Sequence, residues 1–444
     1  MEANLPMQEK KSKKKQPKAA GDDGGHKRHW RETFASVEEI QAFLSDHIYL
    51  RHNVITGRVE YRVPEADQFA ADAGLAATGD WQPVSDRVVN SLWAQLSKAK
   101  PVRAQDIFRV MESDFVPDFH PFRYYLDRLP PWDGESDHIL AMSVSVQVRG
   151  DVEEQMLFYD YLKRWLVGMV AAWVDPKVVN NVILVLIGEQ GSYKTTWFNY
   201  LLPPELSRYF YTKTNASRMG RDDLLTLAQY GLVCCEELDT MSPRDLNQLK
   251  AAVTMPSIDE RAAYAHFHEH RKHIASFCGT GNNVQFLSDP TGNRRWLPFE
   301  VEHIRSPRDD PFDYEGIYAQ AYALYRQGFR YWFSQAEIRR LSAHNRQFET
   351  PTQERELVDM FFRRPANSGE GEFMPVSRAL QIVGGNTANR LSPVLIGRAF
   401  TQLGFDSKMR HGLKGYIVVQ RDAGEIKTRM RQLAIDDEDE ADAF

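Results

Sequence analysis

The sequence predicts an α/β fold with a central sheet, an α-rich module before it and a winged-helix-like module after it. Residues Val182 to Ile187 form an unbroken apolar run, glycines and a Lys-Thr pair follow at once, and apolar residues then recur at helical spacing. Two more apolar runs, Gly231 to Cys235 and Ile274 to Gly279, end in polar residues. We therefore expect several buried strands that deliver polar groups at their ends.

The stretch from Asn181 to Leu202 has the order strand, glycine loop, helix, which is typical of a phosphate-binding loop. The strict pattern has glycine before the lysine, where this chain has Tyr193; the alternative interpretation is a tight βα turn with a chance Lys-Thr pair. In the functional interpretation, backbone N–H groups and the helix N-terminus face ATP, Lys194 reaches the β and γ phosphates, and Thr195 holds Mg²⁺. The residues expected at ATP are Gly188, Glu189, Gln190, Gly191, Ser192, Tyr193, Lys194, Thr195 and Thr196.

Composition limits the class of protein. A length of 444 residues predicts two to four domains. Hydrophobic residues make up 42% of the chain and charged residues 26%, a composition that allows hydrophobic cores to form. The net charge of −6 argues against a uniformly basic surface, so nucleic-acid contacts would come from local patches. Lysines gather at residues 10–18 and carboxylates at residues 436–442, and such runs are typical of solvated, disordered tails.

The cysteines and the hydropathy indicate a cytoplasmic protein. Cys234, Cys235 and Cys278 lie in apolar runs without metal-ligand spacing, which predicts small core residues in a reducing compartment. No run approaches the roughly 18 apolar residues of a membrane span, and the lysine-rich start lacks the apolar segment of a signal peptide.

The order of helical and turn signals predicts the domain organisation. Ser36 caps a first helix, a hairpin turns at Thr56-Gly57, and a long helix runs from Glu153 to Val174. Asp118 and His120 are expected in a solvated loop. In the last module, helices precede a basic hairpin; a helical cap on the central domain is the alternative. The expected parts are a basic arm at 1–30, an α-rich module at 31–120, the α/β domain at 121–303, a helical connector at 304–350, a winged-helix-like module at 351–422 and an acidic tail at 423–444.

Two strand ends carry groups suited to nucleotide hydrolysis. The run Gly231 to Cys235 ends in Glu236 and Glu237, of which the first can hold the Mg²⁺ shell and the second can orient or deprotonate a water. Asn282, at the end of the next buried run, can position that water. The sequence therefore predicts a hydrolytic site between these strand ends.

Two arginines precede the fourth apolar segment, Trp296 to Val301. We expect Arg294 and Arg295 at the same edge of the sheet as the carboxylates, where they would neutralise charge on the transferring phosphoryl group, often of a neighbouring subunit. The alternative is a surface turn with ordinary ion pairs.

The segment Asp259 to His273 alternates basic residues with aromatic ones and predicts a strand-turn-strand hairpin. Basic groups beside aromatics suit phosphate contact and base stacking, so Arg261, His268, Arg271 and Lys272 are candidates for contact with DNA. A solvated hairpin and, from its four histidines, a metal site are the alternatives.

Four motifs, GEQGSYKTTW, CCEELD, FCGTGNN and DPTGNRRW, resemble those of the virulence-associated protein E family over roughly Pro121 to Val301. The resemblance implies a P-loop ATPase core of the AAA+ class, akin to superfamily 3 helicases. It assigns Lys194 and Thr195 to the phosphate loop, Glu236 and Glu237 to the second motif, Asn282 to the sensor and Arg294 or Arg295 to the arginine finger. Family members often carry a primase-like domain, and nothing in this chain matches one.

These observations together predict an ATP-dependent DNA helicase or translocase in the replication of a mobile element, phage or plasmid. It would use ATP and Mg²⁺, act on single-stranded or forked DNA as a homo-oligomer such as a hexameric ring, and work with a separate primase. The alternatives are a nucleotide-gated DNA-binding regulator without unwinding activity and a small-molecule P-loop kinase.

Overall fold

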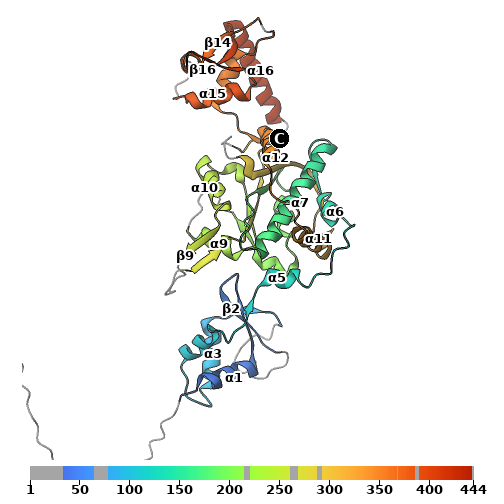
Figure 1. The fold of residues 1–444 in the computed structure, drawn as a ribbon, viewed down its shortest axis with the longest axis vertical. Helices are drawn as coiled ribbons and strands as arrows, with labels where there is room; N and C mark the ends of the chain where they lie inside the picture. The colour runs from blue at the N-terminus through green and yellow to red at the C-terminus, as the bar shows by residue number, and fades with distance from the viewer. Residues whose placement is uncertain are drawn as a thin grey trace, which may run out of the picture. The chain divides into compact units, whose positions relative to one another are not determined.

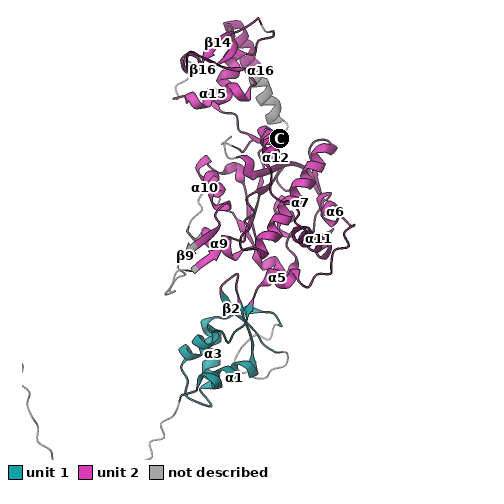
Figure 2. Ribbon diagram, in the orientation of Figure 1, with its two compact units in different colours: residues 1–52, 58–118 teal, residues 53–57, 119–444 magenta. Residues whose placement is uncertain are grey.

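The computed structural model describes residues 34–64, 79–214, 221–260, 269–287, 293–367, 369–385 and 390–442. The chain divides into two compact units, one of residues up to 52 with 58–118 and one of residues 53–57 with 119–444 (Figure 2). The basic arm predicted at residues 1–30 lies outside the described residues.

The first unit combines helices with a small sheet. Ser36 caps the first helix in a capping box with Glu39, and β1 pairs with β2, so the predicted helix cap and hairpin are confirmed; the turn of the hairpin, at residues 53–57, is counted with the second unit. A four-stranded sheet in the order β3-β2-β1-β4 makes the module more mixed than the α-rich prediction. Asp118, expected in a solvated loop, lies in β4 and pairs with His52 Nδ1 at 2.8 Å. The elements are α1 (Val37–His47), β1 (Tyr49–Asn53), β2 (Arg58–Arg62), β3 (Gln82–Pro83), α3 (Asp86–Leu96), α4 (Ala104–Met111) and β4 (Asp118–Phe119).

A six-stranded sheet in the order β5-β12-β6-β11-β8-β7 forms the centre of the second unit. Its strands run parallel to their neighbours, except that β5 is antiparallel to β12. The order places β11 between β6 and β8 although it follows both in sequence. The strands are β5 (Val146–Val148), β6 (Ile183–Ile187), β7 (Phe210–Lys213), β8 (Leu232–Cys235), β11 (Ser276–Gly281) and β12 (Trp296–Ile304).

Helices cover both faces of this sheet, which explains the unbroken apolar run of β6. Leu184 and Leu186 pack in a core with helices α7 and α11, whereas the intervening Val185 packs in a second core with α9 and α10 (Figure 1). The result is a mixed α/β domain of three layers. Its helices are α5 (Pro121–Leu126), α6 (His138–Ser143), α7 (Val152–Val174), α8 (Lys194–Asn199), α9 (Arg221–Gln229), α10 (Pro243–Val253), α11 (Tyr314–Arg326) and α12 (Gln335–His344).

Helix α11 belongs to this core. Ile317, Tyr318 and Ala321 are buried against α7, and the Tyr318 hydroxyl donates to the carbonyl of Leu201 at 2.9 Å. The segment predicted as a helical connector is therefore partly an integral layer of the α/β domain.

The three cysteines are free and fully buried in β8 and β11, so their prediction as core residues is confirmed. Among the helices of the described residues, none is long and apolar enough to cross a membrane.

The carboxyl-terminal module has helices around a small sheet in which β13, β14 and β15 all pair with β16. Phe400 and Tyr416 stack at its centre with ring centroids 4.9 Å apart. The predicted acidic tail contains a helix over residues 423–442, which includes the carboxylate run at 436–442 that was expected to be disordered. The elements are α13 (Gln353–Phe361), β13 (Phe362–Arg363), β14 (Glu372–Pro375), α14 (Val376–Gly384), α15 (Pro393–Gln402), β15 (Ser407–Arg410), β16 (Leu413–Gln420) and α16 (Ala423–Asp442).

Candidate functional site

A cavity of about 360 Å³ lies at the carboxyl ends of three neighbouring parallel strands. The loop after β6, the carboxylates after β8 and the end of β11 meet there because β11 lies between the other two strands. Ligands of open α/β sheets bind at this edge. The cavity is lined by Gln190, Gly191, Ser192, Tyr193, Lys194, Thr195, Thr196, Glu236, Glu237, Thr280, Gly281 and Asn282.

Lys194 is the buried cation of this cavity. Its Nζ donates to the carbonyl oxygens of Gly188 at 2.6 Å and Glu189 at 2.5 Å, and to Ser192 Oγ at 3.2 Å. Burial lowers the pKa of Lys194, and the charges of Asp239 and Glu189 oppose that effect. The loop therefore holds the ammonium group against a polar cavity where an anionic ligand can meet it.

Tyr193 has the left-handed conformation, with φ 63° and ψ 12°, at the position where the strict loop pattern has glycine. A residue with a Cβ adopts this conformation at a cost of roughly 1–2 kcal/mol, which glycine avoids. Tyr193 therefore holds a strained conformation that glycine would adopt without this cost.

Glu237 is left-handed too, with φ 53° and ψ 47°. Only three non-glycine residues in the described parts of the chain have positive φ, and two of them, Tyr193 and Glu237, line the same cavity. Strained backbone that clusters in this way is typical of functional sites.

The loop and the end of β11 are joined directly. The N–H of Gly188 donates to the carbonyl of Gly281 at 3.2 Å. Gly188 has no room for a side chain, since a Cβ there would lie 2.8 Å from the carbonyl oxygen of Val301. Glycine is therefore required at Gly188 for this close approach, independently of any ligand.

Asp239 is a site residue that the sequence interpretation missed. Its Oδ2 accepts a hydrogen bond from the N–H of Asn283 at 3.2 Å, and its charge acts on Lys194. Its Oδ1 is buried and has no hydrogen-bond partner among the described residues. The signal in the sequence was the third carboxylate of the segment Glu236 to Asp239, which follows the buried strand.

The expectation that the paired arginines share the carboxylate edge is wrong. Trp296 at the start of β12 pairs with Ile183 at the start of the parallel strand β6. Arg294 and Arg295 therefore lie at the amino edge of the sheet, and the cavity lies beyond the other end of β6, about 16 Å away at ~3.3 Å per residue. Because strand direction and order were not known from the sequence, adjacency along the chain was misleading.

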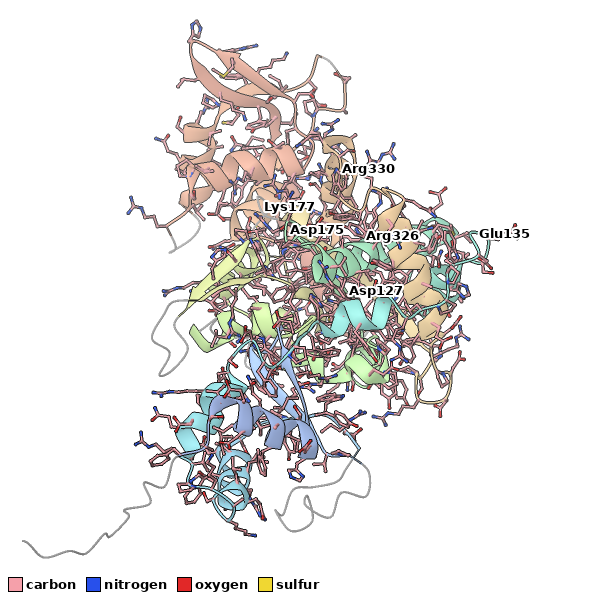
Figure 3. All side chains as sticks on the ribbon, turned by 60° about the horizontal axis from the view of Figure 1, so that its bottom comes forward. Asp127, Glu135, Asp175, Lys177, Arg326 and Arg330 are labelled. Carbon is pink, nitrogen blue, oxygen red and sulfur yellow. The ribbon has the colours of Figure 1, made fainter. Side chains whose placement is uncertain are left out.

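The arginines line a second cavity, of about 610 Å³. It also contains Lys177, labelled in Figure 3 beside Asp175, and the aromatic side chains of Tyr331 and Trp332. Burial, and secondarily the charge of Arg294, lowers the pKa of Arg295.

The hairpin expected to contact DNA is present, because β9 (Ser257–Glu260) pairs antiparallel with β10 (Glu269–Lys272). Arg261 and His268 lie outside the described residues. Arg271 is half-buried and donates from Nη1 to the carbonyl of Thr56 at 3.4 Å, whereas Lys272 is exposed. Of the two described candidates, Lys272 is therefore the more accessible to a ligand.

The fold and the site define a mixed α/β protein with a polar cavity at the carboxyl edge of its sheet. The family model of the virulence-associated protein E-like domain matches residues 126–350, just over half of the chain. The chain belongs to this family. No curated protein matches it.

Solved structures similar to this chain include the apo structure of the NrS-1 C-terminal region, residues 305–718, at 12% identity and a TM-score of 0.45. The alignment covers 86% of this chain and 98% of that one. The A-form apo structure of the NrS-1 C-terminal region has 11% identity and a TM-score of 0.46, with the same coverage.

Proposed function

We propose that the chain is an ATP-dependent DNA helicase or translocase that acts in the replication of a mobile element, phage or plasmid. The observation that carries the proposal is the meeting of a lysine loop, two carboxylates and an amide around one cavity. A buried ammonium group in a glycine loop suits phosphate oxygens, and carboxylates two strands away suit water activation.

Each residue has a role in this hydrolysis. Lys194 would offset charge on the β and γ phosphates, and Glu237 would take a proton from the water that attacks the γ phosphorus. Asn282 would orient that water. The bond to the bridging oxygen then breaks, which releases ADP and phosphate.

Mg²⁺ fits the residues present. The hydroxyl of Thr195 and the carboxylate of Glu236 line the cavity, and oxygen ligands are those that Mg²⁺ prefers. The ion would neutralise charge that develops on the phosphates.

We also propose that this domain is a P-loop sheet of the AAA+ class, akin to superfamily 3 helicases, and that the last module is winged-helix-like. The order α13, β14, α14, α15 and the hairpin β15–β16 supports the second part, because helices precede a two-stranded wing. We place the protein in the cytoplasm, where buried thiols stay reduced.

The position of Arg294 and Arg295 supports an oligomer. Since they lie at the edge of the sheet opposite to the cavity, they would act on nucleotide bound by a neighbouring copy. A homo-oligomer such as a hexameric ring satisfies this geometry, with single-stranded or forked DNA contacted through the β9–β10 hairpin. A separate primase would supply primers.

The test measures the rate of ATP hydrolysis and the unwinding of a forked duplex, each with and without added single-stranded DNA. We expect hydrolysis that rises with single-stranded DNA and strand separation that requires ATP. Hydrolysis without strand separation would favour the nucleotide-gated regulator, and absence of both from a folded protein would overturn the proposal.

A further inference from the structure

Strands β15 and β16 form a ribbon that is anchored at one end to the core of the module. At its base Tyr416 pairs with Ser407, is buried, and donates from its hydroxyl to the carbonyl of Gly397 in α15 at 2.6 Å. The turn at the other end has positive φ at both residues, 52° at His411 and 77° at Gly412, which matches the twist of a tight hairpin. The ribbon therefore has a fixed base and a defined end.

The end of the ribbon is exposed on both faces. Met409 pairs with Lys414, and Arg410 pairs with Leu413. Side chains alternate between faces along a strand, so each face of the ribbon end carries one cation and one apolar residue. Met409 is 66% exposed and Leu413 is 56% exposed, so the core of the module covers neither of them.

The ribbon is cationic in an acidic protein. Residues 407–420 contain Lys408, Arg410 and Lys414 and no aspartate or glutamate, although the whole chain has a net charge of −6. All three cations are exposed. The local charge therefore complements a polyanion.

We infer that this ribbon enters the minor groove of double-stranded DNA with its turn foremost, so that its cations contact the phosphates while Met409 and Leu413, on opposite faces, both lie against base pairs. Proteins that bend DNA use Met and Leu as wedges in this groove. A duplex fits better than a single strand, because single-strand surfaces rely on aromatic stacking and residues 407–415 contain no Phe, Tyr or Trp. This binding rests on the proposed action on DNA and deepens it, but it uses neither the cavity nor ATP, so its failure can be told apart from a failure of ATP hydrolysis.

The test compares two variants of the full chain for binding to a labelled duplex, without nucleotide, across a salt series. Lys408→Gln with Lys414→Gln should reduce the slope of log affinity against log salt by about 1–2, since each lost phosphate contact removes ~0.9. Met409→Ser with Leu413→Ser should weaken duplex binding about tenfold and leave the slope unchanged, because the apolar contact releases no counterion. The serine variant should also bend an end-labelled duplex less in a fluorescence-transfer assay.

Helix α16 supplies matched controls on the same module. Lys427 is exposed and Met430 is 51% exposed, so Lys427→Gln and Met430→Ser should change neither affinity nor slope. All variants should keep the wild-type unfolding midpoint. If a double variant of the ribbon unfolds earlier, each of its two substitutions is tested alone. Wild-type duplex binding by both ribbon variants would overturn the inference, as would an equal loss on the single strand of the same sequence. Vesicles of phosphatidylserine can be added at the same concentration of negative charge as the duplex. If they displace the duplex, the ribbon is assigned to a membrane surface instead.

Discussion

The Oδ2 of Asp239 accepts the N–H of Asn283, just beyond the end of β11, at 3.2 Å, while the charge of Asp239 acts on Lys194 in the loop after β6. Asn283 follows Asn282, the amide proposed to orient water. A buried carboxylate oxygen without a partner, such as Oδ1, is costly and needs a reason. We propose that Asp239 positions the end of β11 relative to the lysine loop.

The substitution Asp239→Ala should lower the kcat for ATP about 100-fold and change ATP affinity little. The reason is that a small displacement of a positioning group costs about this much in rate. Asp239→Asn keeps an acceptor for Asn283 and should retain most of the activity. If the alanine variant turned over ATP as fast as wild type, Asp239 would have no positioning role.

The strain at Tyr193 predicts a stabilising substitution. Tyr193→Gly removes the cost of left-handed backbone, offset in part by the greater freedom of glycine in the unfolded chain. We expect the free energy of unfolding to rise by about 0.5–1 kcal/mol, as measured in urea. Tyr200→Gly is the control: Tyr200 has φ −85°, so glycine there should only destabilise. A destabilised Tyr193→Gly protein would show that the side chain, 46% exposed, contributes more than the strain costs.

The structure contains a half-buried histidine that should make stability fall in acid. His120 Nδ1 accepts the N–H of Arg123 at 3.3 Å at the start of α5, and burial lowers the pKa of His120 to about 4. Because the unfolded chain binds this proton near pH 6.5 and the folded chain does not, stability falls as pH drops from 6.5 towards 4, by up to about 2 kcal/mol. His120→Asn keeps a capping acceptor that does not titrate. The loss of stability between pH 7 and pH 5 should be smaller in that variant, and an equal loss would place the acid sensitivity elsewhere.

Much of the sheet and part of the site could be predicted because their signals are local. The run at β6 and the first helix with its Ser36 cap are visible in a few consecutive residues. Whether Arg294 lies at the amino or the carboxyl edge of the sheet depends on the pairing of Trp296 with Ile183, which no local pattern encodes. Asp239 was missed for the same reason, since its bond to Asn283 spans 44 residues.

The arginine assignment predicts complementation between inactive proteins. Arg294→Ala with Arg295→Ala should hydrolyse ATP at least about 10³-fold more slowly while still binding it. Mixed with an excess of Glu237→Gln protein, it should regain partial activity. Some interfaces then combine an intact glutamate from one chain with intact arginines from the other. An inactive mixture in which light scattering shows mixed oligomers would contradict action across a subunit boundary.

The most direct test of the account is the ATP turnover of the Glu237→Gln protein, with ATP binding measured on the same sample. Glu237 lines the cavity and has a strained backbone, and the substitution preserves its size while removing the base. We expect wild-type ATP affinity, because Lys194 and its loop are intact, and a fall in turnover of about 10²–10⁴-fold, the usual contribution of a general base. Turnover at the wild-type rate would contradict the assignment of this cavity as the hydrolytic site.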